Sequence, residues 1–335
     1  MTPKLFVTGI TGYIGGSAVD VIIKAHPEYE VAALVRSDDK AELVKSKYSS
    51  VRIVKGDLDS VDTIKAECAK ADIVLHFADC DHVASAKAIT EGLAASDKPK
   101  YLIHTSGSAL LADISKPERF GATILSEEKY ADVSTLSTVT SFPEEGHVHR
   151  DVDTIVLASP SNVHTAIVCP PTIYGPGLGV ANTRSIQTPG LTKAILKRGK
   201  GFTVRGGKNV WNSVHIRDLC ALYLLLTEAA VKGGQGADWD TEGYYFAEDG
   251  DFSWGELARE ITKRAAAKGY LKSAEVEELD VEEVKKLHPF GHVLWGTNSI
   301  GKAERARKLG WAPTEKSLLE TLDELIEQEA KLQGL

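Results

Sequence analysis

The sequence lacks the cysteine clusters that metal-binding and disulfide-stabilised proteins carry. Its four cysteines, Cys68, Cys80, Cys169 and Cys220, are widely spaced and form no C-x-x-C pair. We interpret them as reduced packing residues. The stretch 76–82 (HFADCDH) holds several possible ligands, but it overlaps the end of an expected strand, where alternate side chains face opposite ways. We therefore expect no metal site.

Long apolar runs and blocks of positive charge are also absent. No apolar stretch approaches the roughly 20 residues that a membrane-spanning helix requires. The first expected strand begins at Lys4, which leaves no room for a signal peptide. The net charge is −8 and no Lys/Arg cluster occurs, which argues against nucleic acid. We expect a cytoplasmic protein whose partner is a small-molecule substrate, with no nucleic acid and no membrane.

What the sequence does have is enough apolar residues for a large core and a regular alternation of elements. The 335 residues, 43% of them hydrophobic, suit one large two-lobed unit or two domains. Strands are expected at 4–8, 29–35, 51–55, 73–77 and 101–105, with helices near 13–26, 38–48, 60–70 and 82–97. This order predicts an α/β fold with a Rossmann-type doubly wound parallel sheet.

The alternation fails between residues 111 and 149, where prolines, glycines and a Ser/Thr-rich stretch predict a long irregular insertion. Such an insertion either forms a lid or binding loop or runs over the surface as a floppy excursion. Further helices are expected near 151–158, 186–199, 219–230, 254–267, 280–287 and 317–331, and further strands at 163–168, 202–204 and 244–247. We expect a Rossmann domain over 1–175 with a returning segment at about 205–232. A smaller C-terminal substrate lobe would comprise about 176–204 and 233–335.

A glycine-rich turn, 8–15 (TGITGYIG), lies between the first expected strand and the first helix. Gly9 would permit the tight turn, Gly12 the approach of a pyrophosphate, and Gly15 close packing of helix on strand. The N–H groups at the helix start would then face an anion. The pattern predicts a dinucleotide site, and a glycine-rich loop of another α/β domain is the alternative. The other expected contacts in the turn are Thr11, Tyr13 and Ile14.

The second expected strand leads into Arg36 and Ser37, where an NAD-specific site typically has a carboxylate. A guanidinium beside a hydroxyl suits the 2′-phosphate of NADP(H), so we favour that cofactor. A solvated surface arginine is the alternative, and the two following aspartates weaken the case. After the third strand, Asp57 would accept from the adenine amino group beside the Leu58 backbone, unless this is a simple acidic turn.

Motifs along nearly the whole chain resemble the extended and atypical short-chain dehydrogenase/reductase superfamily. The segments concerned are 8–15, 56–58, 76–78, 105–108, 170–177, 214–219 and 309–313. The pattern is most similar to a fungal-type branch that is NAD-dependent epimerase/dehydratase-like or NmrA-like. The resemblance implies further cofactor contacts from Phe77, Ala78, Thr105 and Pro170.

The resemblance also implies a catalytic serine at the end of the fifth strand. Gly107 stands where that serine is expected, so a neighbour must substitute. The candidates are Thr105, Ser106 and Ser108. In this family the serine orients the substrate carbonyl.

A Tyr-x-x-x-Lys pair on the following helix is the other part of the family's catalytic machinery. No such pair occurs between residues 110 and 180, and the position four residues after Tyr130 is Ser134. Counting back from Pro170 places His149 and Asp153 in the Tyr and Lys positions. His149 could be the general acid or base, with Asp153 one helical turn away to fix its tautomer or raise its pKa. An ordinary solvated histidine at a helix start is the alternative.

A second reconstruction assigns the proton to Tyr174, with Ser106 or Ser108 positioning the substrate. Expected substrate contacts are His147, Arg184 and Trp211. Arg184 would pair with an anionic group of the substrate or bridge the lobes. Aromatic residues of the second lobe, Trp211 among them, would build an apolar pocket or simply belong to the core.

Three functions remain open on these residues. The first is an NADP(H)-dependent oxidoreductase that reduces a carbonyl, imine or activated alkene with a non-standard proton donor. The second is an NADP-bound isomerase, dehydratase or cyclase, and the third an NmrA-like NADP(H) sensor without catalysis. The pocket favours an enzyme. A monomer or weak homodimer is expected.

Overall fold

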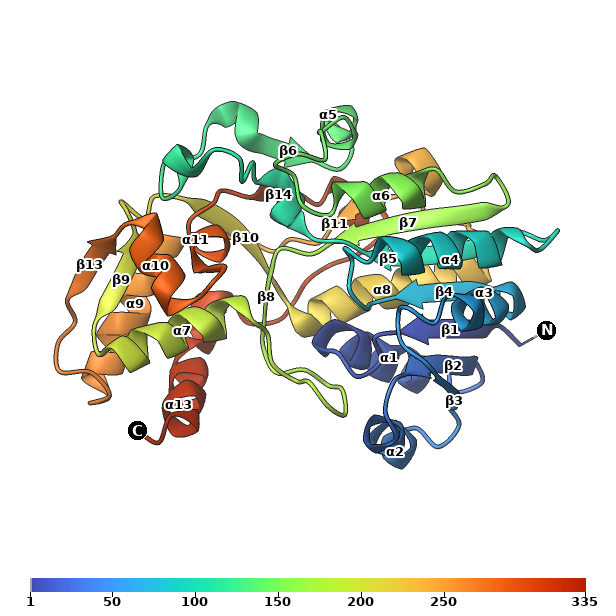
Figure 1. Cartoon of the computed structure of the whole chain (residues 1–335), viewed down its shortest axis with the longest axis horizontal. Helices are drawn as coiled ribbons and strands as arrows, with labels where there is room; N and C mark the ends of the chain where they lie inside the picture. Colours follow the sequence, from blue (N-terminus) through green and yellow to red (C-terminus); the bar gives the residue numbers. More distant parts are fainter. Residues whose placement is uncertain (1) are drawn as a thin grey trace.

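The computed structural model describes residues 2–335 and contains a seven-stranded, entirely parallel sheet in the order β11-β7-β5-β4-β1-β2-β3 (Figure 1). Its strands are β1 (Lys4–Thr8), β2 (Glu30–Val35), β3 (Arg52–Lys55), β4 (Ile73–His76), β5 (Lys100–Thr105), β7 (Val163–Cys169) and β11 (Tyr244–Phe246). The first five lie within one residue of their predicted bounds. The predicted α/β class with a Rossmann-type sheet is confirmed.

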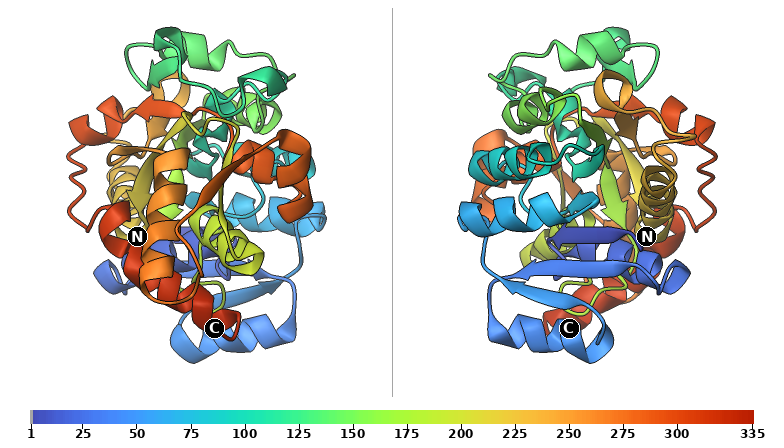
Figure 2. Two further views of the ribbon diagram at one scale, coloured as in Figure 1. Left: turned by 90° about the vertical axis from the view of Figure 1, so that its left-hand side faces the viewer. Right: turned by 90° about the vertical axis from the view of Figure 1, so that its right-hand side faces the viewer.

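Helices cover both faces of this sheet (Figures 1 and 2). One face carries α1 (Tyr13–Ala25), α2 (Asp38–Lys47) and α8 (Ile216–Val231), and the other carries α3 (Val61–Lys70), α4 (Val83–Ala94) and α6 (Arg150–Leu157). Because both faces are covered, β4 and β5 are buried along their whole length. The carboxyl ends of the strands all point toward the second lobe, which places any ligand of the sheet between the lobes.

A second hydrophobic cluster forms the smaller lobe, around Phe202, Ile261 and Ile326. Its elements are α7 (Gln187–Arg198), β9 (Gly201–Val204), α9 (Trp254–Ala267), β13 (Val276–Leu279), α10 (Val281–Leu287), α11 (Gly291–Leu294) and α13 (Leu322–Leu332). Between the lobes, β8 (Thr172–Tyr174) pairs with β10 (Val210–His215), and β10 with β12 (Asp251–Ser253).

The insertion at 111–149 is attached to the body of the protein. It contains β6 (Lys129–Ala131) and α5 (Leu136–Thr140), and β6 pairs in parallel with β14 (Ile300–Lys302). The buried Asp132 carboxylate accepts hydrogen bonds from the backbone N–H of Phe246, at 2.8 Å, and from two residues of α12 (Glu304–Lys308). Of the two alternatives for the insertion, the floppy surface excursion is wrong, because this buried carboxylate fixes the segment to two distant elements.

The segment 244–247, expected in the substrate lobe, belongs to the first lobe. It forms β11, the edge strand beside β7, with Tyr244 opposite Ile167. Tyr244, Tyr245 and Phe246 are fully buried in the first hydrophobic cluster, and a continuous apolar run of this kind suits an edge of a sheet that helices cover. Separately, no helix among residues 2–335 combines the length and the apolar character needed to cross a bilayer.

Candidate functional site

The glycine turn lies at the carboxyl end of β1 and leads directly into α1. Gly9 has a φ of +81°, and a Cβ at this position would lie 2.6 Å from the carbonyl carbon of Phe77. A Cβ at Gly15 would lie 2.4 Å from the Gly9 carbonyl oxygen, so any side chain would separate the helix from the strand. Gly12 is the N-cap of α1 and its lack of a side chain keeps the helix N-terminus open. These residues fit the pyrophosphate of a dinucleotide.

The remaining expected cofactor residues follow the ends of successive strands. Arg36 comes directly after β2, Asp57 and Leu58 after β3, and Phe77 and Ala78 after β4. Thr11, Tyr13 and Ile14 lie in the glycine turn, where the Tyr13 hydroxyl donates to the carbonyl oxygen of Gly175 at 2.6 Å and the Thr11 carbonyl oxygen accepts from the Asn182 N–H. Thr105 faces inward, since its hydroxyl is bonded to Tyr223 at 2.7 Å.

Arg36 is exposed at the edge of the site, and among residues 2–335 its side chain forms no ion pair. Asp38, an acidic neighbour that would repel a phosphate, is paired with Lys55 at 2.6 Å. The Asp57 carboxylate accepts from Ser60 and from the backbone of Asp59, and these hydrogen bonds, that of Ser60 foremost, lower its pKa. The edge thus offers a free guanidinium for a phosphate.

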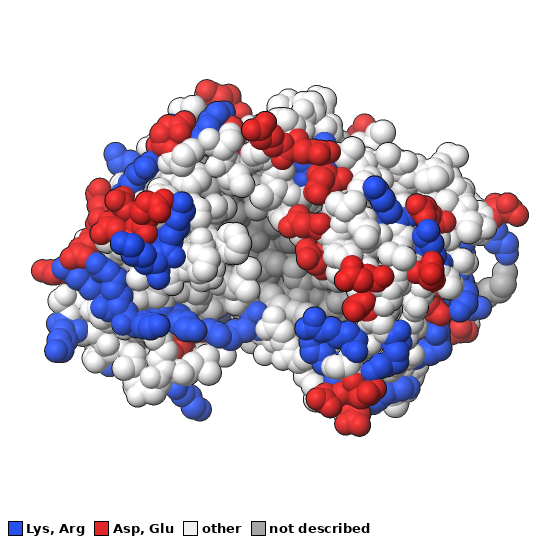
Figure 3. All heavy atoms as spheres, in the orientation of Figure 1, with Lys and Arg blue, Asp and Glu red and all other residues white. Residues whose placement is uncertain are grey.

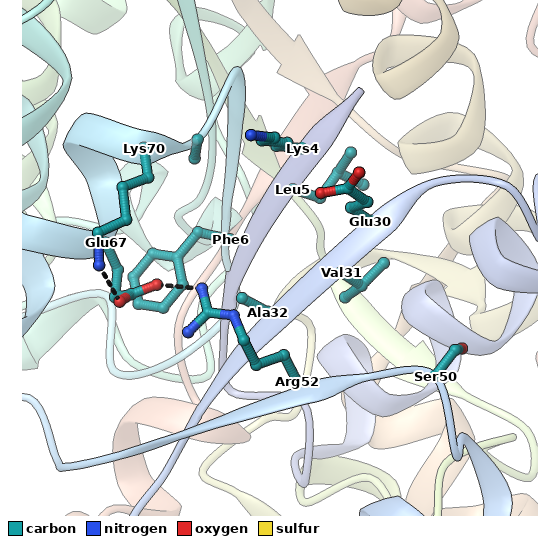
Figure 4. A pocket seen from close by; sticks show the side chains of 11 residues that line it. Lys4, Leu5, Phe6, Glu30, Val31, Ala32, Ser50, Arg52, Glu67 and Lys70 are labelled. Atoms are coloured by element: carbon teal, nitrogen blue, oxygen red, sulfur yellow. Dashed lines mark hydrogen bonds and ion pairs between the residues drawn. The ribbon is translucent and has the colours of Figure 1, made fainter. Parts of the chain in front are cut away.

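A cavity of about 570 Å³ lies between the glycine turn and the second lobe. It is lined by Tyr13, Ile14, Phe77 and Pro170 of the expected cofactor site, by Ser106, Ser108 and His149, and by Trp211 and Arg184. A different pocket, drawn in Figure 4, lies at the amino end of the sheet, where Glu67 forms ion pairs with Arg52 and Lys70. Ligands of a parallel sheet bind at the opposite, carboxyl edge, so the cavity between the lobes is the candidate site.

His149 projects into this cavity from a strained position. It precedes α6 with a φ of +71°, a left-handed conformation that non-glycine residues rarely adopt. Its Nδ1 lies 2.6 Å from Asp81 Oδ1 and 3.3 Å from the Cys80 sulfur. Burial of the ring opposes its charge, but the hydrogen bonds of Nδ1 to Asp81 and Cys80 outweigh burial and raise the pKa of His149 to about 10. The imidazole is therefore protonated at neutral pH.

The other ring nitrogen of His149 occupies the space above Gly107. A Cβ built on Gly107 would lie 3.1 Å from His149 Nε2, closer than most such contacts. Gly107 is the residue that stands where the family's serine is expected. The histidine ring therefore lies where the side chain of that serine would project.

The expected pairing of His149 with Asp153 is wrong. Because His149 lies outside α6 in a left-handed conformation, the two side chains do not share a helix face. Asp153 is fully buried and accepts from the hydroxyls of Ser106, at 3.1 Å, and Tyr244, at 2.5 Å. Burial raises the pKa of Asp153 to about 6, although these hydrogen bonds oppose the shift. The Ser106 hydroxyl therefore donates its hydrogen bond to this carboxylate and not to a ligand in the cavity.

Two further expectations are wrong. Tyr174 does not line the cavity, because alternation along β8 turns Ile173 toward it and Tyr174 away. Its hydroxyl donates to the carbonyl oxygen of Lys316 at 2.9 Å. His147 lies outside the cavity in the insertion, stacked on Phe142 and bonded through Nδ1 to the Leu110 carbonyl oxygen at 2.7 Å.

The other expected contacts do border the cavity. Arg184 forms an ion pair with the buried Glu329 of α13, another element of the second lobe. Trp211 is buried, and its indole N–H donates to the Thr297 carbonyl oxygen at 2.8 Å. The Ser108 hydroxyl lies 3.0 Å from that of Ser299 and lines the cavity.

Sequence reasoning missed Asp81 and Cys80 as partners of His149. Cys80, Asp81 and His149 place possible metal-ligand atoms within 4.8 Å of one another. However, the 2.6 Å between Nδ1 and Oδ1 is a hydrogen-bond distance and requires a proton between the two atoms. We therefore interpret the cluster as a hydrogen-bonded ion pair. The sequence signal for it is the stretch 76–82, in which Cys80 and Asp81 follow β4 at the carboxyl edge of the sheet.

Comparison with known proteins identifies the family of the chain. Residues 1–98 match the model of the NmrA-like family. The chain is 38% identical to the protein named oxidase ucsJ of an Acremonium species, over the full length of both chains. This chain belongs to the same family as that oxidase, and its motifs resemble the extended short-chain dehydrogenase/reductase superfamily. It is thus of an oxidoreductase-type family, as the motifs predicted.

Solved structures of the superfamily share its fold. DesIV, a dTDP-glucose 4,6-dehydratase from Streptomyces venezuelae with NAD bound, is 18% identical and superposes with a TM-score of 0.66 over 99% of this chain and 98% of its own. Vestitone reductase from alfalfa is also 18% identical, with a TM-score of 0.62 over 99% of both chains.

Proposed function

We propose that this protein is an NADPH-dependent reductase of a small-molecule carbonyl, with His149 as the proton donor. Bound NADPH would supply the hydride to the carbonyl carbon. His149 Nε2–H gives its proton to the carbonyl oxygen as the alkoxide develops, and the C=O bond becomes an alcohol. Water replaces that proton, aided by Asp81, which is half-exposed beside the ring.

The observation that carries the proposal is the position of the His149 ring above Gly107. The family's machinery aligns a carbonyl with a hydroxyl at this point and protonates it from a neighbouring side chain. Here the imidazolium of His149 occupies that position and lines the cavity. It is charged because Asp81 lies beside it. Ser108 remains to orient the carbonyl, since Ser106 is bonded to Asp153.

Preference for NADPH over NADH rests on Arg36. Its guanidinium has no intramolecular partner among the described residues, and the Asp38 carboxylate, two residues along the chain, is paired with Lys55. A free guanidinium and the Ser37 hydroxyl suit the 2′-phosphate.

A second candidate is the reverse reaction, oxidation of an alcohol, which the name of the Acremonium relative favours. That direction needs a neutral imidazole to accept a proton. Because the pKa of His149 is about 10, the protonated form dominates at neutral pH and favours reduction. Oxidation would become effective only as the pH approaches the pKa of the ring.

The test is NADPH consumption, followed by nicotinamide absorbance, against a panel of aldehydes, ketones and imines. His149→Gln should lower kcat by at least about 100-fold, the usual contribution of a general acid, while the Kd of NADPH changes little. His147→Gln is the matched control, because that ring lies outside the cavity and should leave kcat unchanged. Equal activity of the two variants, or tight NADPH binding without any turnover, would overturn the proposal.

A further inference from the structure

The wall of the cavity opposite the glycine turn is largely apolar. It includes Ile173, Ile186, Trp211, Phe290, Val293 and Leu294, most of them from the second lobe. From these residues we infer that the substrate is an uncharged, predominantly apolar molecule that covers Ile186 and Phe290 when it binds. The inference rests on the proposed site around His149 and names the class of substrate that the site accepts.

Ile186 and Phe290 are unusually exposed for their size. They are 71% and 68% exposed, the highest values among the large apolar side chains described, and both line this one cavity. Ile186 precedes α7 and Phe290 precedes α11, so two separate elements bring them to the same opening. Scattered apolar residues are ordinary on a protein surface, but two that converge on a cavity mark a binding surface. Covering them with apolar ligand is favourable by about 25 cal/mol for each Å² removed from water.

Charged ligands find no free partner in the same cavity. Its charged lining residues among those described are Asp81, His149 and Arg184. His149 is paired with Asp81, and Arg184 with the buried Glu329. The helix N-terminus at the glycine turn would be occupied by the pyrophosphate of NADPH, so a second diphosphate would find no unpaired guanidinium or ammonium group in this described lining, and Asp81 at the edge would repel it. Figure 3 shows uncharged surface around much of the hollow between the lobes, acidic groups on the rim of the first lobe, and Lys and Arg groups along the lower rim of both lobes.

The shared fold therefore serves a different kind of ligand here. DesIV is named for dTDP-glucose, a sugar joined to a nucleoside diphosphate. The cavity of this chain, with apolar walls and no unpaired cation in its lining, excludes that class by the desolvation cost of the phosphates.

A binding experiment tests the substrate class without requiring turnover. The neutral fluorescent probe N-phenyl-1-naphthylamine is titrated into the full-length protein saturated with NADPH. We expect saturable binding that Phe290→Ser and Ile186→Ser each weaken at least about fivefold, as the loss of roughly half of a buried apolar side chain predicts. Leu332→Ser, which removes an exposed leucine of α13 outside the cavity, is the matched control and should bind as the wild type does.

Competition completes the test. Millimolar dTDP-glucose should leave the probe bound, whereas 2-decanone should displace it. Displacement by dTDP-glucose, or equal probe affinity in the cavity variants and the control, would overturn the inference.

Turnover of 2-alkanones of increasing length shows whether a negative result contradicts the substrate class or the proposed reductase activity. In the wild type, kcat/KM should rise about threefold to fourfold per added methylene until the chain leaves the cavity, and Phe290→Ser should flatten the rise. If no alkanone is reduced while the probe retains its dependence on Phe290 and Ile186, the reductase proposal fails and the substrate class stands.

Discussion

The His149 ring lies against Gly107 at the end of β5, in space that a side chain at position 107 would fill. A glycine at position 107 leaves room for the ring, and the left-handed backbone of His149 turns the ring into that room. Backbone strain of this kind costs about 1–3 kcal/mol and persists at functional sites where surrounding contacts fix it. Here Asp81 and Cys80 supply those contacts.

Replacing Asp81 should change the pH dependence of reduction. The pKa of His149 is raised to about 10 in the folded protein by its hydrogen bonds, so the proton donor is present below that pH and lost above it. Asp81→Asn removes the anion, and the alkaline fall in kcat should move to lower pH, toward the ordinary histidine value of about 6.5. Profiles of kcat against pH for the two proteins measure the shift, and coincident alkaline limbs would exclude His149 as the acid.

Asp153→Asn should make the protein more stable at neutral pH. The folded pKa of Asp153 is about 6, above its unfolded value, so the protonated carboxyl favours folding at low pH and ionisation costs stability as the pH rises through 6. Asparagine carries no charge and still accepts from Ser106 and Tyr244, while its amide can donate to the buried His104, whose Nε2 lies 3.8 Å from Asp153 Oδ1 without a hydrogen bond to the described residues.

We expect urea unfolding at neutral pH to show a gain of about 3 kcal/mol for Asp153→Asn, which shrinks in acid. A loss of stability at both pH values would show that the carboxylate is needed for packing. Ser106→Ala is a useful control, because it removes one donor to Asp153 and should destabilise the protein at neutral pH.

At the level of secondary-structure elements, we expect the residue after β2 to determine whether NADPH or NADH binds more tightly. Arg36→Asp places a carboxylate beside the 2′-position, where it would repel the phosphate of NADPH and accept from the hydroxyl of NADH. The Kd of NADPH should rise at least about tenfold, the effect of losing one charge-assisted contact, whereas that of NADH should stay level or fall. Fluorescence titration with both cofactors measures this, with Arg52→Asp at the amino end of the sheet as control. An equal rise in the Kd of both cofactors would contradict the proposed role of Arg36 in binding the 2′-phosphate.

The strands and helices of the first 105 residues could be predicted because local apolar patterning specifies them. The short strands β6 and β14 could not, since each has three residues and depends on a partner far along the chain. The same limit applies to the site. Asp81 is 68 residues from His149, and their contact depends on where the turn after β4 meets the segment before α6. Spacing within one helix suggested Asp153 instead.

At the scale of the whole molecule, the two lobes have separate hydrophobic clusters, and α13 completes the second. The loop after β8 joins them, with the Leu178 N–H donating to the Ser17 hydroxyl of α1 at one end and Arg184 pairing with Glu329 of α13 at the other. The loop after β8 thus borders the cavity and contacts both lobes.

Arg184→Ala should weaken the contact of this loop with α13 and destabilise the protein by about 2–3 kcal/mol, because Glu329 would be left buried without a partner. Glu329→Gln in the same protein should recover most of the loss, and chemical denaturation of the four proteins of this cycle measures the coupling. If Arg184 instead bound a substrate anion, Arg184→Ala would raise KM and leave unfolding unchanged.

The proposed reaction transfers the hydride of bound NADPH to a carbonyl while His149 protonates the oxygen. Single-turnover reaction with NADPH deuterated at the transferable C4 position, read by mass spectrometry of the product, tests it most directly. We expect an alcohol carrying one deuterium with the wild type and His147→Gln, and a reaction slowed by at least about 100-fold with His149→Gln. Tight NADPH binding with no deuterium in any product would contradict it.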